Sequence, residues 1–452
     1  MKRALLSGIC LIAPLLPPAV AAQPLAGDPF AEPAEIADDA AAPGIPFLQR
    51  GWLESRNQFR LRDGRSISAR QRLWLEGGHN FGGNQAKRLF LSGSLDWDGA
   101  AASLSGDTDE FAARLHEAYF TFEGERADLM LGRKMARFGT GDGINPLDLI
   151  NPQDHRDPFA SGRSDNRLPV WLGQTVVALP KPAFLEDFSL QAVAAPLAKV
   201  TRLPGRGSVW ELPSLRALRQ QEDAGTLRLA EQDLPASWFE EGKYLLHLSA
   251  TTRGWDIGLA AFSGPVNTPV LVGRTNERGE RLITPEHPGM SALGLTFAKG
   301  LNRSTLRGEL AYKPSHPLQL QSDASTLPDF ARRDLIEGVI GFDRTFGLNR
   351  YLNLQYFAAA VPDDAGLAQD GFTHGLTYEL YDQFAGDDLK LGVSGIIGFS
   401  GQGWTLQPYA EYKLGDDWLL TASVMLFSGD REGSYGQYGK SDFATLKLRR
   451  SF

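Results

Sequence analysis

The stretch Leu406-Gln407-Pro408-Tyr409-Ala410-Glu411-Tyr412-Lys413-Leu414 alternates between two kinds of side chain. One phase holds Leu406, Ala410, Tyr412 and Leu414, and the other holds Gln407, Tyr409, Glu411 and Lys413. Successive side chains of a strand point to opposite faces, so this pattern predicts a strand with one apolar and one polar face. The same alternation recurs at 66–76, 306–310 and 352–356. A soluble β-sandwich also alternates, so alternation alone does not decide the fold.

The number of candidate strands and the lengths of their connections say more about the fold. Eighteen candidate strands lie near 51–62, 66–81, 88–101, 113–124, 127–139, 170–180, 187–196, 243–253, 255–264, 290–299, 302–314, 333–347, 350–361, 371–386, 389–401, 404–415, 417–428 and 441–452. Most are longer than the about 5–6 residues of soluble strands and match the about 9–11 residues of a tilted membrane strand. Every second connection is a tight turn, as at 253–254, whereas the others are mostly long, as at 197–242.

An even strand number with short turns on one side and long loops on the other is typical of a bacterial outer-membrane barrel. We therefore predict an all-β fold. It is a transmembrane antiparallel β-barrel of about 18 strands, within a range of about 16–18, with long extracellular loops and short periplasmic turns.

The first residues of the chain predict a signal peptide over residues 1–22. Lys2 and Arg3 precede an apolar run, which ends in the small residues Val20-Ala21-Ala22. Residues 23–49 are acidic, rich in Ala and Pro, and contain no basic residue. This composition predicts a disordered periplasmic tether over 23–50, so the barrel is expected to occupy 51–452.

Composition excludes several other classes of protein. The one cysteine among 452 residues, Cys10, lies in the predicted signal peptide, which excludes small scaffolds held together by disulfides. Lys and Arg number 46 against 54 Asp and Glu, which disfavours nucleic-acid binding. No run of about 18 apolar residues follows the signal, so we expect no membrane-spanning helix.

The C-terminal strand ends in an aromatic residue, Phe452. Counting back from it in twos gives Arg450, Leu448, Leu446 and Ala444 on one face. This arrangement resembles the terminal β-signal that outer-membrane barrels present to their assembly machinery, and Phe452 is the residue implied to carry it. Arg450 departs from the apolar pattern, although a cation near the interface costs only about 0–1 kcal/mol.

Two Asn-Pro-x-Asp segments, at 145–148 and 151–154, follow the fifth candidate strand. Asn caps a helical turn and Pro suits its first position, so each copy predicts a rigid turn. This arrangement resembles a broad group of poorly characterised proteobacterial outer-membrane barrels related to alginate-export and porin-like families. The connection 140–169 is also the third external loop, which in general porins folds into the lumen and narrows it.

By this resemblance, the polar side chains of the loop are candidates for a constriction. They are Asp142, Asn145, Asp148, Asn151, Asp154, Arg156, Asp157, Arg163 and Arg167. The candidates on the lumen wall are Arg56, Arg60, Arg70, Arg72 and Glu76. Opposed charges across a pore create a transverse field that selects solutes. Two other interpretations stay open: an external loop whose Asp residues cap turns, and wall charges that pair with one another in a filled lumen.

Several other chemistries are disfavoured. His247 and Ser249 share a strand face, but no third group and no following Asn completes the pattern of the phospholipase barrels, so we expect no enzyme and no catalytic residue. Metal ligands are not clustered, so no metal or cofactor is expected. We interpret Gly139-x-Gly141-x-Gly143 as a flexible hinge. Residues 204–241 predict one or two short amphipathic helices that lid the pore, dock a partner or pack on the barrel rim.

The resemblance implies a channel for passive diffusion of small solutes in the outer membrane of a Gram-negative cell, narrowed by 140–169. The alternatives are the outer-membrane component of a lipid or polysaccharide export system, docked through 23–50, and a structural or adhesive barrel. The implied partners are outer-membrane lipids and the barrel-assembly machinery. A periplasmic partner at 23–50 and a homotrimer, common among porins, also stay open, whereas nucleic acid is not expected.

Overall fold

The computed structural model describes residues 47–81, 86–106, 109–159, 166–235, 238–322 and 326–452. The predicted signal peptide and most of the predicted tether therefore lie outside the described residues. The barrel begins with β1 at Leu48 rather than at the expected residue 51.

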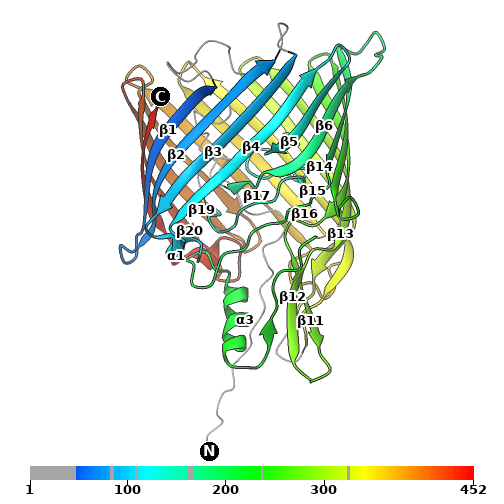
Figure 1. Ribbon diagram of the computed structural model, residues 1–452, viewed down its shortest axis with the longest axis vertical. Coiled ribbons are helices and arrows are strands. Elements are labelled where there is room, and N and C mark those ends of the chain that lie inside the picture. The colour runs from blue at the N-terminus through cyan, green and yellow to red at the C-terminus, as the bar shows by residue number, and fades with distance from the viewer. Residues whose placement is uncertain (1–46, 82–85, 107–108, 160–165, 236–237, 323–325) are drawn as a thin grey trace, which may run out of the picture.

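Eighteen antiparallel strands form one closed barrel (Figure 1). They are β1 (Leu48–Arg60), β2 (Ser66–Phe81), β3 (Lys87–Asp98), β4 (Phe111–Glu123), β5 (Ala127–Lys134), β6 (Val170–Ala178), β7 (Asp187–Ala195), β9 (Lys243–Thr252), β10 (Trp255–Pro265), β13 (Gly289–Leu301), β14 (Ser304–Gln319), β15 (Phe330–Phe346), β16 (Arg350–Ala360), β17 (Phe372–Phe384), β18 (Leu389–Gly398), β19 (Gly403–Leu414), β20 (Trp418–Ser428) and β21 (Phe443–Ser451). The first and last strands pair from Trp52↔Ser451 to Arg60↔Phe443 and close the barrel. The predicted all-β barrel of 18 strands is thus confirmed.

The alternation of side chains divides each strand between the interior and the exterior of the barrel. On β1, Glu54, Arg56 and Gln58 are buried inside, whereas Leu53 and Phe59 are 50% and 43% exposed. Every barrel strand except β7 carries at least one large apolar side chain that is exposed in this way. A polar inner face and an apolar outer face are the pattern of a barrel whose outside contacts lipid.

The connections at the two ends of the barrel differ in length. Short turns join β9 to β10 and β13 to β14, and in Figure 1 they lie at the upper end with the C-terminus. The β9–β10 turn consists of Arg253 and Gly254, both with positive φ, of 50° and 69°. Two such residues match the turn that follows the natural twist of a hairpin.

The long loops gather at the opposite end, where part of them extends beyond the barrel (Figure 1). β11 (Val270–Thr275) and β12 (Arg281–Glu286) form a hairpin that pairs with β8 (Arg228–Leu229), and this small sheet was not predicted. The helices there are α1 (Ala101–Leu104), α3 (Pro213–Asp223) and the 3-10 helix η1 (Gly436–Tyr438). Helix α3 confirms that 204–241 contains a short amphipathic helix. No helix within the described residues is long and apolar enough to cross a membrane.

An apolar cluster packs the long loops onto the barrel rim. Trp210 is fully buried against Phe159, Phe427 and Phe443, with ring centroids 5.0 to 6.2 Å away. Leu218 of α3 joins the same cluster, so the apolar face of α3 is used for packing against neighbouring loops and strands.

Candidate functional site

Residues 135–169 join β5 to β6 and are named L3 here, and their described part, 135–159 and 166–169, runs into the inside of the barrel. The carboxylate of Glu309 on β14 accepts hydrogen bonds from the backbone N–H groups of Thr140 and Gly141. It also accepts one from the N–H of Leu147 at 3.3 Å. The pairing runs β5–β6–β7–β9–β10–β13–β14, so Glu309 is six strands away around the wall from the start of L3.

A second wall residue, Gln355 on β16, holds the next part of L3. Its side-chain oxygen accepts a hydrogen bond from the N–H of Asp142 at 2.7 Å, and its amide donates to the carbonyl of Ile144 at 2.9 Å. Gln355 is 1% exposed, so its side chain makes these hydrogen bonds away from water. Strand β16 is two strands beyond β14, and L3 therefore crosses the lumen toward the opposite wall.

The glycine run of L3 is packed and is not the flexible hinge that we expected. Gly139 has φ of +86°, and a Cβ there would collide with the Glu309 carboxylate and the Asn145 side chain. A residue with a side chain would thus be strained in its backbone and would push L3 off β14. The glycines allow a close approach of backbone to a buried carboxylate.

The two Asn-Pro-x-Asp segments adopt different structures. In the first, the N–H of Asp148 donates to the carbonyl of Asn145 at 3.2 Å, which closes the predicted turn. In the second, the Asn151 side chain donates to the carbonyls of Lys134 and Leu168, at 3.2 and 2.8 Å, and accepts from the N–H of Ala136. Asn151 thus ties the two ends of L3 together, because its amide can satisfy several backbone groups at once.

The acidic candidates of L3 meet cations in two ways. The ion pairs are Asp142 with Arg307 on β14 at 2.7 Å, Asp157 with Arg56 on β1 at 2.7 Å, Asp154 with Arg156 at 2.6 Å, and Asp148 with Arg167. Two of the four acids therefore reach wall strands, and the other two pair within L3. Arg163 lies outside the described residues.

The other wall candidates pair close to their own positions in the wall. These pairs are Arg70 with Glu54 at 2.9 Å, Arg72 with Asp96 at 2.9 Å, Arg60 with Asp63 at 2.8 Å, and Glu76 with Arg50 at 3.6 Å. Arg70 and Arg72 form buried pairs, in which the loss of one partner would leave the other charge uncompensated.

Lys243, at the start of β9, joins three loops and was not predicted from the sequence. Its fully buried ammonium donates to the carbonyls of Ile150 in L3 at 3.0 Å and of Lys199 at 2.9 Å, and to the side-chain oxygen of Asn267. Lys199 belongs to residues 196–242, named L4, and Asn267 to residues 266–288, named L5. Three donors on one ammonium match three acceptors from three loops.

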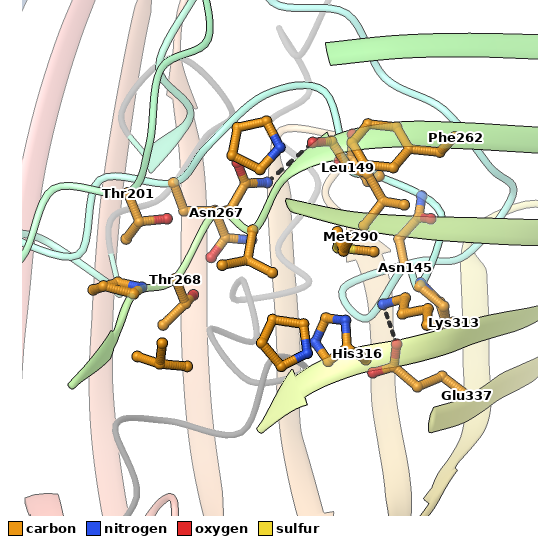
Figure 2. A pocket seen from close by; sticks show the side chains of 18 of the residues that line it. Asn145, Leu149, Thr201, Phe262, Asn267, Thr268, Met290, Lys313, His316 and Glu337 are labelled. Carbon is orange, nitrogen blue, oxygen red and sulfur yellow. Dashed lines mark hydrogen bonds and ion pairs between the residues drawn. The ribbon is translucent and has the colours of Figure 1, made fainter. Parts of the chain in front are cut away.

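A cavity of about 140 Å³ lies where these loops meet the wall. Figure 2 shows Asn145 and Leu149 of L3, Asn267 of L5, and Lys313 and His316 of β14 around it. Lys313 pairs with Glu337 on β15. The cavity therefore has polar groups from both the loops and the wall.

Two loop histidines are held in the neutral form. Burial lowers the pKa of the His155 imidazole in L3 to about 4, against the opposing effect of Asp154. Burial likewise lowers the pKa of His287 in L5 to about 4. His287 donates from Nδ1 to the carbonyl of Val266 at 2.8 Å and contacts the Gln232 amide through Nε2 at 2.7 Å, so it joins L4 to L5.

Two further sequence candidates lie apart from L3. Phe452 continues the ladder between β1 and β21 by exchanging backbone hydrogen bonds of 2.9 Å with Gly51, and its ring covers that glycine. Ser249 shares a hydrogen bond of 2.8 Å with Ser189 on the neighbouring strand β7.

Sequence reasoning missed Glu309, Gln355, Arg307 and Lys243. All four stand on strands that it identified. The available signal was their polar character within alternating strands, which does not tell which inward side chain a loop will meet.

No family model matches this chain, and no curated protein does. Similar solved structures include Salmonella typhi OmpF in complex with daunomycin, at 11% identity and a TM-score of 0.42, covering 89% of this chain and 96% of that chain. Another is an anion-selective porin from Comamonas acidovorans, at 11% identity and a TM-score of 0.41, covering 90% and 99%. A mutant of the Rh. blastica porin shows 10% identity and a TM-score of 0.40, covering 89% and 99%.

Proposed function

We propose that this chain is an outer-membrane channel for passive diffusion of small solutes, with residues 140–169 narrowing its lumen. The observation that carries the proposal is the course of L3, which is bonded to Glu309 on β14 and Gln355 on β16 after leaving β5. A loop at this position reduces the cross-section of the lumen that is available to a solute.

The exterior of the barrel supports a place in a membrane. Its eighteen strands pair into one closed sheet, and a closed barrel is the only sheet arrangement that a bilayer core tolerates. Exposed aromatic residues at strand ends include Trp171, Trp404 and Trp418. Such residues suit the interface between lipid and water.

The interior supports a water-filled passage. A barrel of about 16–18 strands is too wide for its wall side chains to fill, so it ordinarily leaves an aqueous channel. Here L3 crosses that space, and the Asp142–Arg307 pair places opposite charges beside each other in it. Fixed charges at a narrow point select solutes by charge as well as by size.

The experiment is single-channel conductance of the refolded protein in a planar bilayer, with reversal potentials in a salt gradient. We expect discrete open steps, and an altered unit conductance and ion selectivity in Asp142→Ala, because Arg307 then loses that neighbour in the lumen. Asp63→Ala is the matched control, since Asp63 pairs with Arg60 beside the β1–β2 connection.

A folded barrel without conductance steps contradicts the proposal and favours a structural or gated role. Equal effects of Asp142→Ala and Asp63→Ala would instead contradict the position of the constriction. Folding is checked in each case by heat-modifiable migration on gels.

A further inference from the structure

A second cavity, of about 510 Å³, is lined by residues of β1 to β5, of α1, and of parts of L3 and L4. Eight cationic side chains line it. Five of these pair with carboxylates, and they are Arg56, Arg70, Arg114, Arg156 and Arg167. The remaining three are Arg133 of β5 and Lys199 and Arg202 of L4, and we call them the cationic triad.

The triad has no carboxylate partner among the residues that the structure describes. Arg133 donates from Nε to the carbonyl of His116 at 3.2 Å, and Lys199 donates to the carbonyl of Pro169 at 3.1 Å. These carbonyls satisfy hydrogen bonds, but they do not neutralise the charge. Other cations of the same cavity do have carboxylate partners, as Arg114 has Asp96 at 3.1 Å.

The three cations lie close enough to affect one another. Burial first, and then the positive charges of Arg133 and Arg202, lower the pKa of the Lys199 ammonium to about 8. Like charges that each lack a carboxylate partner repel one another, and a bound anion would relieve this repulsion. The geometry therefore has the character of an anion site that needs its ligand.

We propose that the cationic triad binds the phosphoryl group of a phosphate-bearing molecule. Guanidinium forks match the oxygens of a tetrahedral oxyanion in pairs, and an ammonium adds a compact charge with three donors. Three cations suit a group with up to two negative charges better than a single carboxylate. The inference rests on the proposed channel and deepens it by naming an anionic group that the passage holds.

The site has two routes of access. Residues Phe111 to Leu115 of β4 pair with β3, whereas the pairing of β4 with β5 begins only at Ala118↔Arg133. The cavity thus borders a length of β4 that has no second neighbouring strand among the described pairings. Phosphate can then reach the triad as a solute from the lumen or as a lipid headgroup through this part of the wall.

The first experiment is titration calorimetry of the full-length folded barrel in detergent with inorganic phosphate. The variant Arg133→Gln/Lys199→Gln/Arg202→Gln should weaken the affinity by about tenfold for each neutralised cation. The control neutralises three exposed loop cations, as Arg278→Gln/Arg431→Gln/Lys440→Gln, and should bind as the unchanged protein does. The single variant Arg202→Gln, at an exposed side chain, covers the case in which the triple variant does not fold.

The inference is overturned if the folded, unchanged protein does not bind phosphate, or if the triad variant still binds it with the same affinity. This readout does not need an open channel, so its failure and a failure of conductance are distinguishable. The source of the phosphoryl group is tested in nanodiscs of phosphatidylcholine with and without phosphatidic acid. Competition by phosphatidic acid supports a headgroup in the site, whereas phosphate binding that is unaffected supports a soluble ligand.

Discussion

Removal of the Glu309 side chain should release L3 from the opposite wall. Glu309 is 2% exposed and accepts three backbone N–H groups, from Thr140, Gly141 and Leu147. In Glu309→Ala these donors lose a charged acceptor in a buried place. Each hydrogen bond to a charged group contributes about 1.5–3 kcal/mol, but contributions within one cluster are not additive.

We therefore expect the docking of L3 to weaken by about 4 kcal/mol, within the range for breaking a buried charged contact. Since 1.4 kcal/mol corresponds to a factor of ten, the undocked population should rise by roughly three orders of magnitude. Glu309→Gln should have a smaller effect, because its single carbonyl oxygen still accepts the two N–H groups that now meet at Oε1.

The assay is the rate of thiol labelling in a Leu147→Cys background, because Leu147 is 3% exposed and labels only when L3 leaves the wall. The sole native cysteine, Cys10, lies in the predicted signal peptide. Glu337→Ala is the matched control, since Glu337 is a buried carboxylate of the neighbouring strand that pairs with Lys313. Equal labelling rates in Glu309→Ala and the unchanged background would refute this reasoning, and a larger conductance in Glu309→Ala would support it independently.

Three further predictions concern the loops. Low pH should undock the loops from the inside of the barrel. Above about pH 6.5, His155 and His287 are neutral in both the docked and the undocked loops. Between about pH 6.5 and pH 4, these histidines bind a proton only when the loops are undocked. By pH 4, protonation of each histidine should reduce the free energy of loop docking by about 3 kcal/mol. The measurement is the rate of loop proteolysis against pH, and this pH dependence should be lost in His155→Gln/His287→Gln. Lys243→Met leaves three buried acceptors without a donor, so the docked loops should lose about 3 kcal/mol of stability. The measurement is the rate of loop proteolysis at neutral pH, and heat-modifiable migration should show that the barrel remains folded. Trp210→Ala empties the rim cluster and should destabilise the same loops by about 3–5 kcal/mol in hydrogen exchange, with unchanged strand protection as the internal control.

The sequence determined the wall of the barrel. The candidate strand 404–415 matches β19 (Gly403–Leu414) to within one residue at each end, and Arg253 with Gly254 predicted the tight β9–β10 turn. These features are local, because the phase of a strand and the conformation of a turn depend on neighbouring residues. The helix at 213–223 followed from the same kind of local periodicity.

Only the tertiary structure decided which groups meet inside the barrel. Asp142 lies 165 residues from Arg307 along the chain, and no local pattern links them. The sequence suggested a hinge at Gly139, whereas the structure uses that glycine to bring backbone onto Glu309. Likewise, the charge of Lys243, Arg133 or Arg202 was visible, but its role depends on which loops fold back into the lumen. Contacts across a closed barrel are set by strand order and loop course, and these arise only when the whole sheet has closed.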